Sequence, residues 1–351
     1  MKKIWTGLLI VVCLIHAGAV FAQESNLKND ETVWFFPSLA VEQADGSFKV
    51  RVDAWVFEEE SRRLATSAFA SWMGIDLDKL SPEQKATFAE RSRYFRTDSE
   101  RGKELKVRLA GQIFTLPRTD ASGRAQGEFS VGKEWVQWKG DWGMVSWTLE
   151  VPGYSKHGQL GFAFVIPAEG VFIVSDIDDT IKISEVRDKK ALMRNTFVEP
   201  FRAVPGMAEW YREMQRIGTG EPRVFFHYLS ASPIQLGPAL AKFLRDADFP
   251  ESILYLREST SWRTLYADKE TSIAHKKKVL TRLLTDFPKR KFILIGDSGE
   301  SDPEIYADIA RDYPERILAI HIRNVTGEDR AAPRYQKTFA GIDPQIWHIR
   351  D

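Results

Sequence analysis

Cysteine is almost absent from this sequence, since Cys13 is the only one among 351 residues. It lies in an N-terminal stretch that we expect to be removed, so the mature chain would contain no cysteine at all. This excludes a disulfide framework, a zinc–thiolate site and a cysteine nucleophile. The folded protein must therefore be stabilised by its core alone.

An excess of charge is also absent, because 49 lysines and arginines balance 49 aspartates and glutamates. No basic run with interleaved aromatic residues occurs, which argues against nucleic acid as a partner. The sequence contains no internal repeat, no low-complexity linker and no feature that indicates a protein partner. A hydrophobic content of 43% and a length of 351 residues are typical of a soluble protein with two domains.

The only long hydrophobic run is at the N-terminus, where it predicts a secretory signal peptide over residues 1–22. Two lysines precede an apolar core over residues 4–15, and the small residues before Ala22 suit cleavage after that residue. An uncleaved membrane anchor is the alternative, because residues 4–25 carry a single charge, Glu24. Polar interruptions of the run favour cleavage. We therefore expect an exported protein, periplasmic or secreted.

Residues 23–168 have the pattern of a β-rich domain. Every second residue between positions 48 and 56 is apolar, and the residues between them are charged or polar in the first part of this stretch. Further alternating stretches occur at residues 105–109, 129–131, 145–151 and 160–166. Ser81 and Pro82 predict the start of one helix, as an N-cap and a first helical residue. Short strands separated by glycine-containing turns predict a sandwich-like fold.

Seven of the eleven tryptophans lie in this β-rich half. Packing in the core of a sandwich is the main interpretation of this enrichment. The alternative is that some of them, such as Trp138 and Trp142 near a predicted turn, enter a lipid interface, where tryptophan is favoured. Peripheral membrane contact is therefore one expectation for this half.

The pattern changes after residue 168, and residues 169–351 alternate apolar runs with helical stretches. Predicted strands cover residues 171–175, 224–229, 252–256, 292–296 and 316–321. Predicted helices cover residues 205–217, 233–247, 271–286 and 302–312. This alternation predicts an α/β domain with a doubly wound parallel sheet.

The first of these strands is followed directly by acidic residues. Four apolar residues, 171–174, precede Asp176, Asp178 and Asp179. In an open parallel sheet, ligands bind at the carboxyl ends of the strands. Neighbouring carboxylates repel one another next to an apolar strand, and a cation would relieve that repulsion. Hard oxygen ligands of this kind suit Mg²⁺.

Two further strand ends carry polar groups. Ser230 follows the second strand, and we interpret it as a hydrogen-bond donor to a phosphoryl group, whereas Ser232 before Pro233 reads as a helix N-cap. Asp297 and Asp302 follow the fourth strand in a glycine-containing loop, which is typical of a metal-holding loop.

A lysine run, residues 276–278, begins the helix before the fourth strand. A charge run of this kind usually forms a solvated face. One inward lysine could instead neutralise the acidic cluster, and the spacing alone does not choose among the three.

Four elements follow one another along the chain: DxDxT at residues 176–180, the serine Ser230, the lysine run, and GDxxxxD at residues 296–302. Their order resembles the four motifs of the haloacid-dehalogenase superfamily. More closely, residues 175–181, 227–233, 275–276 and 295–300 resemble the actin-patch-type phosphatidate phosphatase family, which is related to the lipins. The resemblance covers roughly residues 170–325 and implies a haloacid-dehalogenase-like fold. It selects Lys276 as the inward lysine. Ala231 departs from the asparagine that is frequent in the family.

The resemblance implies Mg²⁺-dependent hydrolysis of phosphatidate to diacylglycerol and phosphate through an aspartyl-phosphate. Asp176 would be the nucleophile, and Asp178 a general acid and base with a raised pKa. Metal ligands would be Asp176, the Asp178 backbone carbonyl, Asp297 and Asp302. Substrate contacts would come from Thr180, which would also fix the loop, and from Ser230 and Lys276.

Two other functions stay open beside this one. Soluble phosphomonoesters are an alternative substrate, and a phosphatidate-binding module without turnover is an alternative of another class. The presence of both Asp176 and Asp178 argues against the binding module. Neither the segment between the first two motifs nor the segment between Ser230 and Lys276 holds a large cap domain, which suits a bulky or membrane-embedded substrate. In the latter segment, Trp262, Arg263 and Tyr266 could meet a head group or form an ordinary packed loop.

Overall fold

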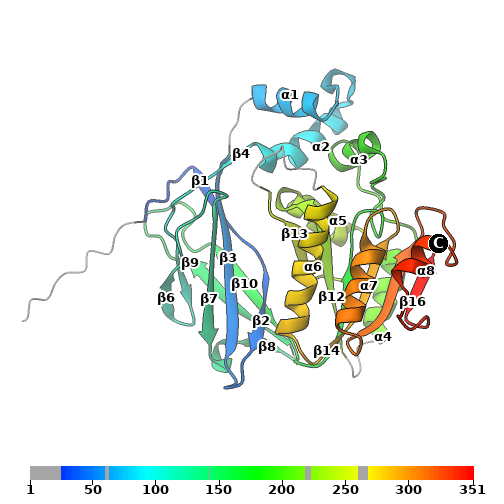
Figure 1. Ribbon diagram of the computed structural model, residues 1–351. Helices are drawn as coiled ribbons and strands as arrows, with labels where there is room; N and C mark the ends of the chain where they lie inside the picture. The colour runs from blue at the N-terminus through cyan, green and yellow to red at the C-terminus, as the bar shows by residue number, and fades with distance from the viewer. Residues whose placement is uncertain (1–24, 60–62, 141, 218–222, 260–267) are drawn as a thin grey trace, which may run out of the picture.

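The computed structural model describes residues 25–351 apart from residues 60–62, 141, 218–222 and 260–267 (Figure 1). The predicted signal peptide therefore lies outside the described residues. Among the helices of the described part, none combines the length and the apolar character needed to cross a membrane.

The first half of the chain forms a ten-stranded sheet, in the order β1-β3-β2-β10-β9-β5-β6, with β4 and β7 beside β3 and β8 beside β9. Its strands are β1 (Glu31–Phe35), β2 (Ser38–Glu42), β3 (Phe48–Glu59), β4 (Thr97–Ser99), β5 (Lys106–Leu109), β6 (Gln112–Thr115), β7 (Arg124–Val131), β8 (Gln137–Lys139), β9 (Trp142–Leu149) and β10 (Leu160–Val165). Most neighbours are antiparallel, whereas β2 and β10 are parallel. The prediction of a β-rich first half is confirmed.

Alternation of apolar and polar residues builds the core of this half. In β3, Phe48, Val50, Val52 and Ala54 are buried, and the residues between them are half-buried. These side chains share one core with the inward residues of β5, β9 and β10, so two layers of strands pack face to face. Of the tryptophans, Trp147 lies in this core, which agrees with the packing interpretation for that residue.

Two helices interrupt the β-rich half between β3 and β4. They are α1 (Arg63–Trp72) and α2 (Pro82–Ser92), with short 3₁₀ turns at Leu77–Lys79 and Arg93–Arg96. The predicted start of α2 is confirmed: the Ser81 hydroxyl accepts a hydrogen bond from the Gln84 N–H, and the Gln84 side chain accepts one from the Ser81 N–H. This reciprocal capping satisfies backbone donors that the first helical turn leaves free.

The second half forms a six-stranded parallel sheet in the order β13-β12-β11-β14-β15-β16. Its strands are β11 (Gly170–Ser175), β12 (Val224–Pro233), β13 (Ile253–Arg257), β14 (Arg290–Asp297), β15 (Ile317–Arg323) and β16 (Trp347–Arg350). All five predicted strands occur, and β16 was not predicted. The strand order changes direction between β11 and β14, which is the topological switch point of this sheet.

Helices cover both faces of the parallel sheet. They are α3 (Lys189–Phe197), α4 (Met207–Ile217), α5 (Gly237–Asp246), α6 (Lys269–Asp286), α7 (Asp302–Asp312) and α8 (Pro333–Thr338). Helices α4 and α5 pack with Ile173 of β11 on one face, whereas α6 and α7 pack with Phe172 and Val174 on the other. The prediction of a parallel α/β fold with helices is confirmed, and α3 and α8 were not predicted.

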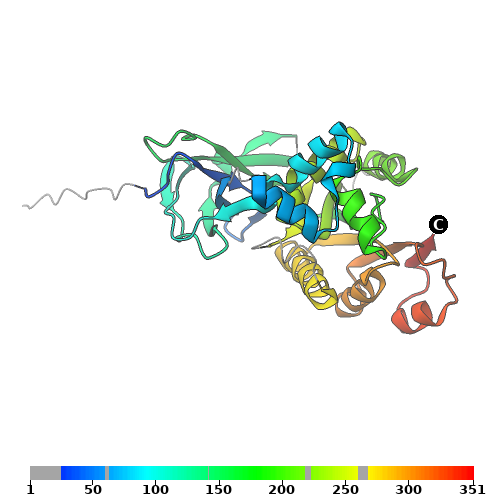
Figure 2. The same cartoon turned by 90° about the horizontal axis from the view of Figure 1, so that it is seen from above.

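The inserted helices of the first half pack against the second half. Figures 1 and 2 show α1 and α2 beside α3, above the end of the parallel sheet where the strands finish. The Phe197 ring of α3 lies 5.6 Å from the ring of Phe69, 6.4 Å from that of Phe88 and 5.4 Å from that of Phe95. The two halves therefore share one hydrophobic cluster, which also includes Ile177.

Candidate active site

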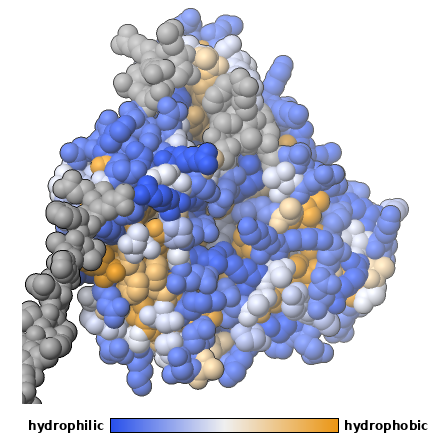
Figure 3. Space-filling model, turned by 60° about the vertical axis from the view of Figure 1, so that its left-hand side comes forward, coloured by the Kyte–Doolittle hydropathy of each residue, from blue (hydrophilic) through white to orange (hydrophobic). Residues whose placement is uncertain are grey.

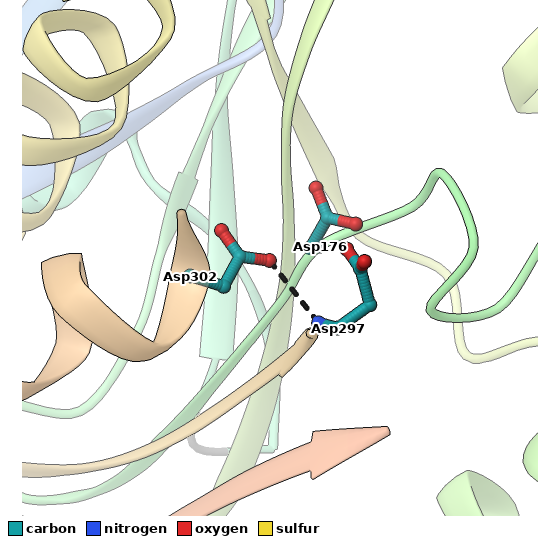
Figure 4. Close-up of side chains that lie close together, drawn as sticks. All are labelled: Asp176, Asp297 and Asp302. Atoms are coloured by element: carbon teal, nitrogen blue, oxygen red, sulfur yellow. Dashed lines mark hydrogen bonds between the residues drawn. The ribbon is translucent and has the colours of Figure 1, made fainter. Parts of the chain in front are cut away.

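Three carboxylates meet at the switch point of the parallel sheet. Asp176 follows β11, Asp297 ends β14 and Asp302 begins α7, and one oxygen of each lies within 4.8 Å of the others (Figure 4). All three side chains are buried. The structure thus brings together the acidic residues that the sequence placed after the first and fourth strands.

Glycine makes the close approach of Asp297 and Asp302 possible. The Asp302 carboxylate accepts a hydrogen bond from the Asp297 N–H at 3.3 Å (Figure 4). A Cβ atom at Gly296 would lie 2.4 Å from this carboxylate, closer than van der Waals contact allows. Asp297 is fixed in turn by the N–H of Gly299, which donates to it at 2.6 Å. The loop therefore presents two carboxylates at fixed positions.

Lys276 of α6 contacts the carboxylate cluster directly. Its ammonium group donates to Asp176 at 2.8 Å and to Asp302 at 2.5 Å, and it lies 3.4 Å from Glu300. The side chain of Lys277, by contrast, is 40% exposed and pairs with Asp308, which is 46% exposed. The structure therefore selects Lys276 from the three lysines that spacing left open.

Burial and neighbouring charges shift the pKa values of Lys276 and Asp176. Burial lowers the pKa of Lys276, but the carboxylates of Asp176 and Asp302 offset that effect and hold its pKa well above the usual value. Burial also raises the pKa of Asp176 well above its usual value, with Lys276 opposing this and Asp302 adding to it. Several carboxyl groups thus face one lysine, and a further cation in the cluster would favour their ionised forms.

The donor set fits a divalent cation. One carboxylate oxygen of Asp297, Oδ2, is buried and has no hydrogen-bond partner among the described residues. Burial raises the pKa of Asp297, and the neighbouring Asp302 and Asp176 raise it further. Closely spaced carboxylate oxygens are the ligands that hard divalent cations prefer.

Asp178 has surroundings that differ from the prediction. Its carboxylate pairs with the Lys182 ammonium at 2.8 Å and accepts hydrogen bonds from Ser184 at 2.7 Å, Ser230 at 3.1 Å and Ser232 at 2.9 Å. Burial raises the pKa of Asp178, but Lys182 and the hydroxyl groups outweigh it and lower the pKa to about 2. The expected raised pKa is therefore wrong for this arrangement, because neither the sequence argument nor the resemblance included Lys182.

Asp179 shapes the loop and does not face the other carboxylates. Its side chain accepts hydrogen bonds from the backbone N–H groups of Ser184, Glu185 and Val186 at 2.7–2.8 Å. Its φ of +56° lies in the left-handed region, which aspartate tolerates better than most residues. This turn carries the chain from β11 back over the site and positions Lys182 and Ser184 next to Asp178.

The remaining predicted residues contact the two catalytic candidates. The Thr180 hydroxyl donates to Asp176 at 2.9 Å, so it orients that side chain, whereas a bond to the loop backbone was expected. Ser230 accepts a hydrogen bond from the Ser232 N–H at 2.9 Å while it donates to Asp178. The predicted capping role of Ser232 is wrong, because β12 continues to Pro233 and α5 begins only at Gly237.

A pocket of about 110 Å³ opens beside Asp178. Its polar lining includes Ser230, Ser232 and Glu300, and its apolar lining includes Leu192 and Met193 of α3. Helices α1, α2 and α3 lie over this edge of the sheet, and the first two come from the β-rich half (Figure 1). Trp262, Arg263 and Tyr266 lie outside the described residues.

The fold and the site define an α/β protein with a buried carboxylate and lysine centre at its topological switch point. Residues 171–324 match the family described as "Phosphatidate phosphatase APP1, catalytic domain". This region of the chain is thus similar to that family and contains every predicted site residue, and the resemblance read from the motifs is confirmed.

Two curated relatives are similar to part of the chain. Phosphatidate phosphatase APP1 of Saccharomyces cerevisiae is 37% identical over 158 residues, which is 44% of this chain and 26% of the relative. The uncharacterized protein C29B5.04c of Schizosaccharomyces pombe is 33% identical over 186 residues, which is 52% of this chain and 30% of the relative. The chain thus matches less than a third of the length of either relative.

The predicted localisation is wrong on this comparison. The sequence argument led to an exported protein with a signal peptide, in a periplasm or outside the cell. The matched relatives are proteins of two yeasts, and neither supports a signal peptide or a periplasmic protein.

Proposed function

We propose that this protein is a phosphatase that hydrolyses phosphatidate to diacylglycerol and phosphate. The observation that carries the proposal is the Asp176 carboxylate at the switch point, held by Thr180 and Lys276 within the region that matches the catalytic domain. The name of the yeast relative supports phosphatidate as the substrate. We further propose a haloacid-dehalogenase-like catalytic domain over residues 169–351, preceded by a β-rich domain over residues 23–168.

Mg²⁺ is the cofactor that we propose for the carboxylate cluster. Asp176, Asp297 and Asp302 would hold it, together with the backbone carbonyl of Asp178, and the buried free oxygen of Asp297 supports this assignment. When bound, the cation supplies positive charge that neutralises the phosphoryl oxygens in the transition state.

Asp176 is the proposed nucleophile. Attack of its carboxylate oxygen on phosphorus would form an aspartyl-phosphate while the bond between phosphorus and the lipid oxygen breaks. Thr180 and Lys276 already hold the two carboxylate oxygens in separate directions, which fixes the attacking geometry before the substrate arrives. Lys276 and Ser230 would then contact the non-bridging phosphoryl oxygens.

Asp178 is the proposed acid and base. It is ionised in the free site, which suits the removal of a proton from water when the aspartyl-phosphate is hydrolysed. For the first step it must give a proton to the leaving alkoxide. A phosphate group entering the pocket adds negative charge next to Asp178, and such charge raises the pKa of a carboxyl group. Substrate binding would thereby supply the protonated form.

The test is phosphate release by the full chain with Mg²⁺, from phosphatidate in mixed micelles and from glycerol phosphate. We expect release from phosphatidate that is lost in Asp176→Asn and in the presence of a chelator. Release from glycerol phosphate alone would replace the lipid substrate by a soluble phosphomonoester. Absence of release from both, with binding to phosphatidate vesicles, would identify a binding module instead.

Peripheral membrane contact is a further part of the proposal, because a phosphatidate phosphatase must reach a lipid surface. Hydrophobic side chains gather on the side of the molecule that carries the β-rich half (Figure 3). In this half, Trp135 and Trp138 are about half exposed, at 49% and 50%, and Trp is favoured at lipid interfaces. Their exposure supports the lipid interpretation for Trp138.

A further inference from the structure

We propose that Arg91, which lies in the β-rich half, is a positioning residue of the catalytic centre. It acts through Phe201 and Lys182 on Asp178, and these four residues are called the positioning chain below. The inference rests on the proposed function for its effect on turnover. Arg91 lies outside residues 171–324, so the matched catalytic region does not contain the first member of this chain.

Arg91 closes the carboxyl end of α3. A single guanidinium nitrogen, Nη1, donates to the backbone carbonyls of Thr196 at 2.8 Å and Glu199 at 2.7 Å, and it lies 3.4 Å from the carbonyl oxygen of Asn195. The last carbonyls of a helix have no partner within the helix, and the helix dipole places negative charge there. Arg91 therefore fixes the point at which the chain leaves α3.

The same guanidinium group lies over an aromatic ring. The distance from Arg91 Cζ to the centroid of the Phe201 ring is 3.6 Å, and Lys182 Nζ lies 4.9 Å from the same centroid. Both distances are within the range of cation–π attraction. The Phe201 ring thus contacts Arg91 from the β-rich half and Lys182 from the segment that follows β11.

Backbone hydrogen bonds join the segment of Phe201 to the loop of Lys182. The N–H of Ile183 donates to the carbonyl of Arg202 at 2.9 Å, and the N–H of Val204 donates to the carbonyl of Ile181 at 2.9 Å. Lys182 is itself bridged to Ala203 in an antiparallel sense. A shift of the chain after α3 would therefore move Lys182 as well.

Lys182 completes the positioning chain. It is 1% exposed, and its ammonium group contacts Asp178 at 2.8 Å and the Ser184 hydroxyl. These contacts fix the carboxylate that lines the pocket. A displacement of about 1 Å of a reacting group can cost on the order of a hundredfold in rate. Arg91 would thus act on the rate of the chemical step, and substrate binding would change little.

The first test compares Arg91→Met with Arg93→Met. Arg93 begins the turn after α2 and pairs with Glu59 of the β-rich half at 2.6 Å, so Arg93→Met is a matched loss of an arginine from the same segment. For Arg91→Met we expect kcat to fall by about tenfold with KM within twofold, consistent with a small displacement. Arg91→Lys should recover part of the rate, and Arg93→Met should keep kcat within twofold. Unchanged kcat in folded Arg91→Met would overturn the proposal.

A double-mutant comparison separates the positioning chain from a general loss of packing. If Arg91 acts through Phe201, the double variant of Arg91→Met and Phe201→Leu should have nearly the kcat of Phe201→Leu alone, since coupled residues are not additive. Additive losses in kcat would contradict an action through the ring.

Hydrogen exchange tests the role of Arg91 even if the protein releases no phosphate. The amides of residues 178–184 should exchange at least tenfold faster in Arg91→Met than in the wild type, and those of β14 should not change. If the wild type releases no phosphate from either substrate, the proposed function fails. Unchanged exchange at residues 178–184 would then overturn the role of Arg91, and faster exchange confined to them would support it.

Discussion

Replacing Lys276 by methionine removes the ammonium group that lies between Asp176, Asp302 and Glu300. Methionine keeps most of the length and apolar character of the lysine side chain, so the change is chiefly one of charge. The side chain is 1% exposed, and water cannot take the place of the lost contacts without a rearrangement. The acids would be left buried and without a counter-charge.

The size of the effect follows from these contacts. Removing one partner of a buried ion pair costs about 3–5 kcal/mol of unfolding free energy, because the remaining charge is uncompensated. The two contacts of Lys276 at 2.8 Å and 2.5 Å place it in this class. With a shift of about 2–4 °C per kcal/mol, the melting temperature should fall by about 10 °C.

The loss should depend on pH. Without Lys276, the pKa of Asp176 in the folded state rises further above its unfolded value. A carboxyl group of this kind stabilises the fold at low pH, and the stability is lost as the pH rises through the folded pKa. The difference in stability between Lys276→Met and the wild type should therefore be smaller at pH 5 than at pH 8.

The assay is urea unfolding at pH 5 and pH 8 without added divalent cations, with Lys277→Met as the control. Lys277 directly follows Lys276 in α6 and pairs with Asp308 in a partly exposed ion pair, a class that contributes about 0–1 kcal/mol. Equal stability of the two variants at pH 8 would refute the reasoning, since it would show that the buried acids do not depend on Lys276.

Two further predictions concern single positions of the parallel sheet. Gly296→Ala should lower the unfolding free energy by about 1–3 kcal/mol and reduce phosphate release, because the new Cβ would lie 2.4 Å from Asp302. Gly237→Ala is the control, since a Cβ there meets only ordinary van der Waals contacts. Equal effects of the two substitutions in urea unfolding and turnover would contradict this prediction. His227 is buried, and burial, with Arg290 adding to it, lowers its pKa to about 3. The unfolded chain then takes up a proton below about pH 6.5 and the folded protein does not, so about 2 kcal/mol of stability is lost between pH 7 and pH 5. His227→Phe should remove that part of the loss in urea unfolding at the two pH values, and an unchanged loss would exclude His227 as its source.

Much of the fold could be predicted because its causes are local. An apolar run that ends in acids, as at Asp176, is sufficient to place a strand and the edge of the sheet where it ends. Lys276 could also have been found by spacing. Val279, Leu280 and Leu283 follow it at intervals of three, four and seven, and all are buried with it on one face of α6.

Other features depend on contacts between distant parts of the chain. Lys182 lies between two isoleucines, and nothing local shows that its ammonium group is buried against Asp178. Ser232 has the local pattern of a cap, but its hydroxyl bonds to Asp178 and the strand continues past it. Arg91 lies in the other half of the chain, so only the packed structure relates it to the site. The short α3 and β16 offer too few residues for a periodic pattern.

The helical insertion has a consequence for the order in which the protein is made. Its apolar residues Phe69, Met73 and Phe88 leave the ribosome well before Ile177 and Phe197, against which they pack. The β-rich half therefore holds an apolar surface without its partner while synthesis continues, and such surfaces favour aggregation. That surface is covered when the segment after β11 has been made, so the nascent chain gains its buried cluster and the geometry of the candidate site in the same event.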